Sequence, residues 1–156
     1  MNAIQITPFS RAYQKEVQGF VLAILEDEMG FFGYERPDLH DIQKTYQSDD
    51  LSNFWIAFNG EELVGTVALL KKTKDLAYIK RMAVKKEYRK QGLGKQLLET
   101  LLHFAKDRGF KMVCAGTVEE NPNAIRFYQQ NGFTLCDHVP EDITASNDSI
   151  CLKFEL

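Results

Sequence analysis

One amphipathic segment limits the folds open to this chain more than any other feature. Between Gly92 and Gly109, apolar side chains recur every three or four residues, which is the spacing of one face of an α-helix. These positions are Leu93, Leu97, Leu98, Leu101, Leu102, Phe104 and Ala105. Apolar runs typical of buried strands lie on either side, from Leu76 to Val84 and from Met112 to Val118. A strand, a helix and a second strand in this order predict a right-handed crossover between two parallel strands.

The part of the chain ahead of this unit predicts one strand and two helices. Residues Ile4 to Thr7 have strand character, Pro8 is expected to end that strand, and Ser10 can cap a helix. The apolar positions of this helix are Val17, Phe20, Val21, Ile24 and Leu25, and Gly30 and Gly33 close the segment. We expect Asp38 to open a second, shorter helix. Its apolar face would consist of Leu39, Ile42 and Tyr46.

The middle of the chain predicts an antiparallel meander. Asn59-Gly60, the strongest short signal for a β-hairpin, joins an aromatic run from Phe54 to Phe58 to a return strand from Leu63 to Leu70. A second turn at Thr73 to Asp75 leads into the strand from Leu76 to Val84. Consecutive strands joined by such short turns pair antiparallel.

The last third of the chain predicts a short helix and two further strands. Asn121 caps the helix, and Pro122 suits its first position. Strands follow from Phe133 to Cys136 and from Ile150 to Leu156. We therefore expect an α+β fold in one domain over residues 1–156. Its mixed sheet would be an antiparallel meander that continues into a parallel pair, flanked by about four helices.

Composition excludes several classes of protein. With 156 residues, 44% of them hydrophobic, the chain suits one domain that needs no disulfide or metal to fold. Its 11 Phe, 6 Tyr and 1 Trp are too many for a disordered chain. No run approaches the roughly 18 apolar residues of a membrane span, and the first residues do not resemble a signal peptide. The formal net charge of −3 argues against a dedicated nucleic-acid binder.

The cysteines and histidines indicate no metal site. Cys114, Cys136 and Cys151 are widely spaced, each lies in an apolar run, and no CxxC pair occurs. The three histidines lack the spacings HxH, HxxxH and HExxH. We therefore predict that no metal is bound. The thiols are expected to be small buried side chains in a reducing compartment, the cytoplasm.

The clearest candidate for a binding segment follows the strand that ends at Val84. It is a basic turn that opens the amphipathic helix at Gly92 and Gly94. The first N–H groups of a helix have no partner within the helix, so they attract anions. The glycines let a phosphate approach the backbone, and positive charge comes from Lys85, Lys86, Arg89, Lys90 and Lys95. The residues alone leave two interpretations open, a phosphate-binding loop and a solvated basic turn.

Two common phosphate-binding loops do not fit this segment. The ATP-type loop GxxxxGK continues with Ser or Thr, whereas Gln96 follows Lys95 here. The dinucleotide-binding pattern GxGxxG requires a third glycine at the position of Leu97. Neither an ATP-type nor a dinucleotide-type loop is therefore expected.

Two other motifs stand in order on either side of the helix and the strand after it. The first is Arg89-Lys90-Gln91-Gly92-Leu93-Gly94, and the second consists of Asn121, Ala124, Tyr128, Gly132 and Phe133. With them the chain resembles the GNAT acetyltransferase superfamily, whose loop reads Arg/Gln-x-x-Gly-x-Gly/Ala and whose later hallmark is an Asn, an Ala and a Tyr before Gly-Phe. The resemblance is sharp from Leu76 to Phe133. It is looser from Ile4 to Leu70, where only the order of the elements matches.

This resemblance implies transfer of an acetyl group from acetyl-CoA to a primary amine, directly through a tetrahedral intermediate and without a metal. It places the pyrophosphate of acetyl-CoA on the loop and the pantetheine arm along the preceding strand, which would be splayed from the next one. The cofactor-binding residues that it implies are Met82, Ala83, Val84, Arg89, Lys90, Gln91, Gly92, Leu93, Gly94, Lys95 and Asn121. Asn121 can also be a plain helix cap, and both roles can coexist.

The resemblance further implies that Tyr128 donates a proton to the departing sulfur. The alternative for Tyr128 is a core tyrosine beside Phe127. An alkyl amine with a pKa of about 10.4 must lose a proton before it attacks. A backbone N–H near Met82 can supply the fixed donor that the oxyanion needs.

The general base is left open by the sequence. Some members of the family carry a Glu on the strand before the loop, but Leu76 to Met82 contains no acid, and Tyr78 lies near the expected place. Our candidate is Glu119, with Glu120 beside it. Both acids can equally be solvated surface groups, and a base acting through water is a further alternative.

The sequence indicates where the acceptor pocket lies and which partners to expect, but it does not identify the acceptor. By resemblance the pocket involves Glu26, Asp27, Glu28, Phe31, Phe32 and Tyr34, whose acids either attract a cationic amine or form a solvated helix end. The expected partners are acetyl-CoA and an amine acceptor, with no nucleic acid and no membrane, and a homodimer is left open. The alternative function is a catalytically silent acyl-CoA-binding or sensory module on the same fold. An interaction protein with a basic loop is disfavoured by the net charge.

Overall fold

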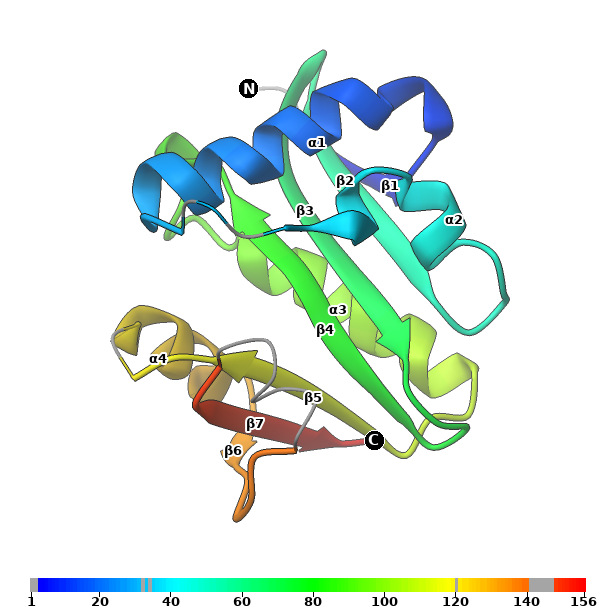
Figure 1. The fold of residues 1–156 in the computed structure, drawn as a ribbon, viewed down its shortest axis with the longest axis vertical. Coiled ribbons are helices and arrows are strands. Elements are labelled where there is room, and N and C mark those ends of the chain that lie inside the picture. The colour runs from blue at the N-terminus through cyan, green and yellow to red at the C-terminus, as the bar shows by residue number, and fades with distance from the viewer. Residues whose placement is uncertain (1–2, 32, 34, 120, 141–147) are drawn as a thin grey trace.

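One mixed sheet runs through the computed structural model, which describes residues 3–31, 33, 35–119, 121–140 and 148–156 (Figure 1). The strands lie in the order β1-β2-β3-β4-β5-β7-β6. They are β1 (Ile4–Pro8), β2 (Asn53–Asn59), β3 (Glu62–Lys71), β4 (Leu76–Val84), β5 (Met112–Thr117), β6 (Thr134–Leu135) and β7 (Ile150–Glu155). The α-helices are α1 (Gln14–Ala23), α2 (Ile42–Tyr46), α3 (Leu93–Asp107) and α4 (Pro122–Gln130).

The pairing of the strands confirms the expected α+β class. Strands β1 to β4 pair antiparallel in sequence order, and the β2–β3 hairpin forms as predicted. Its turn is Gly60-Glu61, one residue later than Asn59-Gly60, because Asn59 still pairs with Glu62. Helix α3 then crosses over to β5, which pairs parallel with β4. Strand β7 is antiparallel to both β5 and β6, so it lies between two strands that precede it in the sequence.

Helices cover both faces of the sheet around its centre (Figure 1). In β2, Phe54 and Ile56 belong to the apolar cluster shared with α1 and α2. Their neighbours Trp55 and Ala57 belong to the opposite cluster, which includes the buried face of α3. Because both faces are covered, β2 is apolar along nearly its whole length rather than alternating between apolar and polar residues. Strand β4 contributes Ala77 and Ile79 to the cluster under α3.

The boundaries of three N-terminal elements differ from the prediction. Pro8 is part of β1, which is an edge strand and tolerates a missing N–H. Ser10 precedes a 3-10 turn and makes no side-chain capping bond. Asp41, not Asp38, caps α2, and its carboxylate accepts a backbone N–H at 3.1 Å. Asp38 instead binds Arg81, because two charge-assisted hydrogen bonds to a guanidinium are stronger than one capping bond.

Candidate active site where the central strands part

Strands β4 and β5 separate part-way along their length. Their pairing begins at Leu76 with Met112 and ends at Ile79 with Ala115. On its other side, β4 stays paired with β3 as far as Val84. In the described ranges, the backbone of β4 beyond Ile79 therefore has no strand partner on the β5 side, as Figure 1 shows. An extended molecule can pair with such a free edge.

A bulge distorts β4 just beyond this point. Arg81 has a left-handed backbone with a φ of 52°, and the register against β3 shifts between Thr66 and Ala68. Thr66 Oγ1 donates a hydrogen bond to the Arg81 carbonyl at 2.8 Å. A residue other than glycine in this conformation costs roughly 1–2 kcal/mol. The bulge must therefore be held by the contacts around it.

The Arg81 side chain supplies the main contact. Its Nε and Nη2 donate to the Asp38 carboxylate at 2.8 Å and 2.7 Å, and the Tyr46 hydroxyl donates to the same carboxylate at 2.6 Å. Burial alone would raise the pKa of Asp38, but the hydrogen bonds and charge of Arg81 outweigh it and hold that pKa below its ordinary value. Burial and the charge of Asp38 raise the pKa of Tyr46, so its hydroxyl stays a donor. Sequence reasoning gave Arg81 no role.

The turn after β4 leads into α3 through two residues with left-handed backbone. A 3-10 turn at Lys86–Tyr88 is followed by Lys90 (φ 60°) and Gly92 (φ 88°), and Gly92 directly precedes the first residue of α3. Lys90, Gln91 and Gly92 are exposed, as are Arg89 and Lys95. The first N–H groups of α3 thus point out of the helix next to exposed cations, an arrangement that suits an anion.

Two positions in this loop serve packing as well. The Leu93 side chain is buried in the cluster under α3, so it offers an anion only its backbone. A Cβ at Gly94 would lie 3.2 Å from Cε1 of Phe127 on α4, whereas a Cβ at Gly92 would have no heavy atom within 4 Å. Gly94 therefore allows α4 to approach α3, and the space above Gly92 is open.

Two candidate site residues of the second motif belong to α4, Tyr128 within the helix and Asn121 at its cap. The Asn121 side chain accepts the Ala124 N–H at 3.2 Å, so Asn121 is a helix cap. Tyr128 is only 6% exposed, and its ring lies 5.2 Å from the rings of Phe127 and Phe133. Burial, followed by the negative charge of Asp148, raises the pKa of Tyr128 well above its ordinary value. The hydroxyl therefore keeps its proton at neutral pH.

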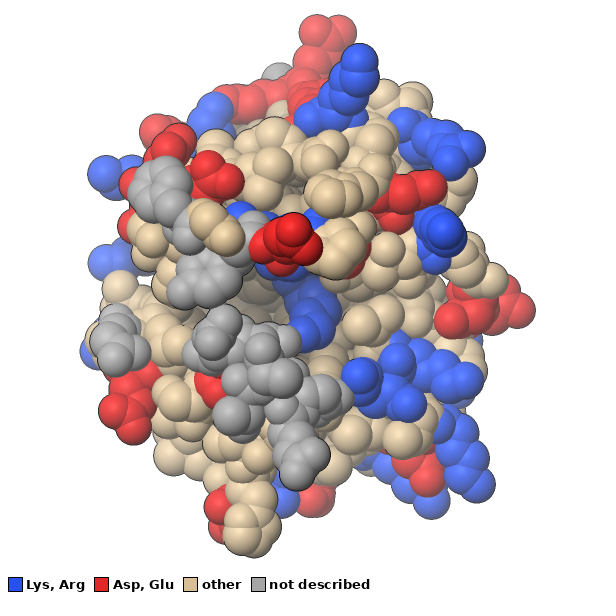
Figure 2. All heavy atoms as spheres, viewed as in Figure 1, with Lys and Arg blue, Asp and Glu red and all other residues tan. Residues whose placement is uncertain are grey.

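Asp148, two residues before β7, is an acid that sequence reasoning missed. Its charge acts on the ionisation of Tyr128 and Lys80, and the charges of Lys80 and Arg81 act on its own. Burial raises the pKa of Asp148, while the charges of Lys80 and Arg81 oppose that shift. Burial lowers the pKa of Lys80. Figure 2 shows basic atoms set back from the surface near the centre of this face, over β4.

The acids named from the sequence are placed differently. Glu119 is exposed after the end of β5. Glu28 Oε2 lies 2.7 Å from Nη2 of Arg89, and Glu26 Oε1 lies 3.8 Å from Nη1 of Arg36. These two acids neutralise arginines of the same chain, so the idea that they attract a cationic amine is weakened. Glu120, Phe32 and Tyr34 lie outside the described residues.

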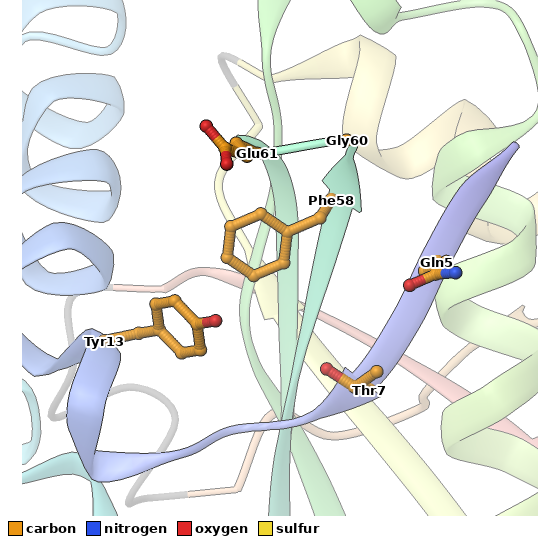
Figure 3. A pocket seen from close by; sticks show the side chains of 6 residues that line it. All are labelled: Gln5, Thr7, Tyr13, Phe58, Gly60 and Glu61. Atoms are coloured by element: carbon orange, nitrogen blue, oxygen red, sulfur yellow. The ribbon is translucent and has the colours of Figure 1, made fainter. Parts of the chain in front are cut away.

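A recess lies on a different part of the molecule, between β1, the β2–β3 hairpin and the 3-10 turn before α1 (Figure 3). The rings of Tyr13 and Phe58 face each other across it, with their centroids 5.1 Å apart. Its other lining residues are Gln5, Thr7, Gly60 and Glu61. None of the residues around the parting of β4 and β5 lines this recess, so it is separate from the candidate site.

Comparison with known proteins assigns the fold and the loop to a family. Residues 20–133 match the model of the acetyltransferase (GNAT) family, which is more than half of the chain. The chain belongs to the GNAT acetyltransferase family. The solved GNAT-family acetyltransferase of Staphylococcus aureus Mu50 is similar with a TM-score of 0.86 and 29% identity over 99% of each chain. The Thermoplasma acidophilum PaiA N-acetyltransferase, solved with coenzyme A, has the same fold, with a TM-score of 0.77 and 19% identity over 99% of each chain.

The curated relatives of this GNAT chain are longer. The probable N-acetyltransferase camello of Xenopus laevis is 35% identical over 109 residues, which are 66% of this chain and 50% of that protein. The chain thus spans about half the length of the curated relatives it matches. No helix of the described residues is long and apolar enough to cross a membrane.

Proposed function

We propose that this GNAT domain transfers an acetyl group from acetyl-CoA to a primary amine. The observation that supports this most is the free edge of β4 between the bulge at Arg81 and the anion-binding turn at Gly92. A thioester substrate with a peptide-like arm and a pyrophosphate needs both features in this order. A single domain over residues 1–156, a homodimer and a cytoplasmic location stay predictions from the sequence.

The residues around β4 suit acetyl-CoA as co-substrate. Met82, Ala83 and Val84 would pair with the pantetheine arm through the strand edge. The first N–H groups of α3, from Leu93 to Lys95, would bind the pyrophosphate, and the open space above Gly92 lets it approach. The remaining contacts in the proposal come from Arg89, Lys90, Gln91 and Gly94 of the loop and from the amide of Asn121. No metal is part of this proposal.

Tyr128 is the proposed proton donor to the sulfur that leaves. Its raised pKa keeps the hydroxyl protonated, and its ring is fixed between Phe127 and Phe133. A donor held in place in this way can assist the departure of the thiolate. The backbone N–H groups next to the bulge, near Met82, would stabilise the oxygen on which negative charge develops.

Asp148 is the proposed acceptor of the amine's proton. It is partly buried, and its charge interacts with those of Tyr128 and Lys80. Its pKa is raised, so it lies closer to neutral pH than the pKa of an exposed carboxyl. Glu119 was the candidate from sequence, but its carboxylate is exposed to water. We therefore place Asp148 ahead of Glu119 as the base.

A thiol-release assay with acetyl-CoA tests the proposed function. A panel of small amines, polyamines, aminoglycosides and peptides would serve as acceptors, and mass spectrometry would identify the acetylated product. Turnover with at least one amine, lost in Tyr128→Phe, is the expected result. Coenzyme A binding without turnover on any amine would contradict the proposal and favour a silent acyl-CoA-binding module.

A further inference from the structure

Three cysteines that are far apart in the sequence meet on one face of the sheet. Cys114 lies on β5, Cys151 on β7 and Cys136 directly after β6, and their sulfur atoms all lie within 4.8 Å of one another. The strand order explains this convergence, because β7 lies between β5 and β6. Cys114 and Cys151 are buried, and Cys136 is partly exposed. None of these thiols has a part in the proposed acetyl transfer.

Cys136 and Cys151 are directly opposite each other. Residues Thr134 and Leu135 pair with Lys153 and Leu152, so Cys136 continues the register opposite Cys151. The Cys136 N–H donates to the Cys151 carbonyl at 2.9 Å, which confirms this position. The two sulfur atoms are 2.7 Å apart. That distance lies inside ordinary contact between sulfurs and approaches the about 2.05 Å of a disulfide bond.

Sheet geometry excludes the other two pairings. Directly opposite residues have Cα atoms about 4.5–5.5 Å apart, within the about 4.4–6.8 Å that a disulfide requires. Cys151 is opposite Gly116 on β5, so Cys114 is its diagonal neighbour, at roughly 7–8 Å. Cys114 and Cys136 lie on opposite sides of β7, two strand spacings apart. Bridging either of these pairs would require the backbone to move.

We propose that Cys136 and Cys151 form a reversible disulfide, while Cys114 stays a thiol. With oxidised glutathione as oxidant, the Cys136 thiolate attacks one sulfur of the glutathione disulfide and releases one glutathione. The Cys151 thiolate then attacks Cys136 Sγ, breaks the mixed disulfide and releases the second glutathione. The two cysteines together lose two electrons, which reduce one glutathione disulfide to two glutathiones, and the two thiol protons end on those glutathiones.

The exposure of the thiols fits this order of events. Cys136 is the partly exposed member of the pair, so it is the thiol that an oxidant reaches first. Hydrogen bonding to Cys114 and burial raise the pKa of Cys151, so its attack is faster at alkaline pH. The bond would close a loop between positions 15 residues apart. It would thereby restrict the unfolded chain and stabilise the fold.

Thiol counting on the whole chain tests the disulfide. The reduced protein is incubated with oxidised glutathione at pH 8.5, unfolded, and titrated with a chromogenic disulfide reagent. We expect one remaining thiol of three, a Cys136–Cys151 peptide in the mass map, and a melting temperature raised by roughly 5–10 °C and restored by dithiothreitol. Cys114→Ser should still lose two thiols and Cys136→Ser none. Serine is close to cysteine in size, so both variants are expected to fold. If one of them does not fold, the other still tests the disulfide.

Other products would overturn the assignment. These are three thiols that stay reactive, a link that includes Cys114, a link between two chains, or a glutathione adduct that does not resolve. A metal site is the competing use of the three sulfurs. Reduced protein that retains one equivalent of Zn²⁺, loses it in Cys136→Ser and resists oxidised glutathione would establish that use instead. None of these readouts depends on acetyl transfer, so the disulfide and the proposed function fail separately.

Discussion

Arg81 and Asp38 form a two-point ion pair across 43 residues of sequence, with hydrogen bonds of 2.8 Å and 2.7 Å. The pair ties the bulge of β4 to the segment just before α2, and each side chain is only about one-fifth exposed, at 22% and 20%. The left-handed backbone of Arg81 is therefore held from outside its own strand. The shape of the free β4 edge depends on a residue that touches no part of the loop.

Replacing Asp38 by Asn should destabilise the protein and weaken acetyl-CoA binding together. The Arg81 guanidinium would stay mostly buried but lose its counter-ion and part of its hydrogen bonding, at a cost of about 1–3 kcal/mol in urea unfolding. The pKa of Asp38 is lowered in the fold, so its contribution to stability is present above pH 4 and is lost as the pH falls further. The Asp38→Asn variant should lack this loss of stability in acid. Arg11→Lys, in an exposed pair, is the control. Unchanged stability in Asp38→Asn would show that the pair does not hold the bulge.

Replacing Tyr128 by Phe should lower the maximal rate and leave the fold largely intact. The ring contacts with Phe127 and Phe133 remain, while the proton donor is lost, an effect of about 10²–10⁴-fold. The drop is expected near the low end, because a thiolate leaves readily without help. Steady-state rates and urea unfolding are measured on one preparation, with Tyr13→Phe as control. The same data separate a catalytic role from a structural one. Lower stability with a full rate per folded molecule would make Tyr128 a core residue only.

Replacing Glu28 by Gln should tighten coenzyme A binding. Arg89 is held by Glu28 at 2.7 Å, so a phosphate must compete with this carboxylate for the guanidinium. An exposed pair of this kind is worth about 0.2–1 kcal/mol, which predicts a gain of up to about five-fold in affinity by calorimetry. Added salt should reduce the difference between the two proteins. Glu26→Gln, whose partner is Arg36, is the control. Weaker binding would mean that Glu28 orients Arg89 for the phosphate.

The choice between Asp148 and Glu119 can be made from the pH dependence of the rate. If Asp148 accepts the amine's proton, the rate rises with pH through the raised pKa of this carboxyl, and Asp148→Asn should remove that rise along with most of the activity. Glu119→Gln should leave the profile unchanged, because its carboxylate is solvated. Thermal melting checks that both variants are folded. An unchanged profile in Asp148→Asn would reject Asp148 as the base.

Replacing the two loop glycines, Gly92 and Gly94, should have different effects on stability, coenzyme A binding and turnover. Gly92→Ala puts a side chain on a residue with a φ of 88°, so it should cost about 1–2 kcal/mol and weaken coenzyme A binding. Gly94→Val must displace the Phe127 ring, so it should loosen α4 and slow turnover as well. Calorimetry with coenzyme A and urea unfolding separate the two effects. Full affinity in a folded Gly92→Ala protein would argue against a phosphate at this turn.

Sequence patterns were informative where a structure depends on residues that are near in the chain. The bounds of β4, Leu76–Val84, agree with the predicted strand, and Gly92 directly precedes α3 as expected. The β2–β3 hairpin also forms where it was predicted, with its turn one residue later, at Gly60-Glu61. Periodicity and turn chemistry act over a few residues, so one sequence is enough to read them.

Contacts between distant segments could not be read in this way. Asp38 looks like a helix cap locally, and only the folded sheet brings Arg81 to it. Asp148 follows no motif, and its place near Tyr128 depends on the position of β7. The sequence shows three widely spaced cysteines and does not indicate that they meet, because nothing in it places β7 between β5 and β6. In each case tertiary placement, rather than local preference, decides the role.

The position of β7 has a consequence for the synthesis of the chain. Until β7 emerges from the ribosome, β5 presents an unpaired edge, and the two-residue β6 lacks the strand with which it pairs in the described structure. Exposed edges of this kind pair readily with strands of other molecules. We expect the nascent chain to be most prone to aggregation in the interval between completion of β6 and insertion of β7. Mutations that slow this insertion should therefore lower the yield of folded protein more than they lower its final stability.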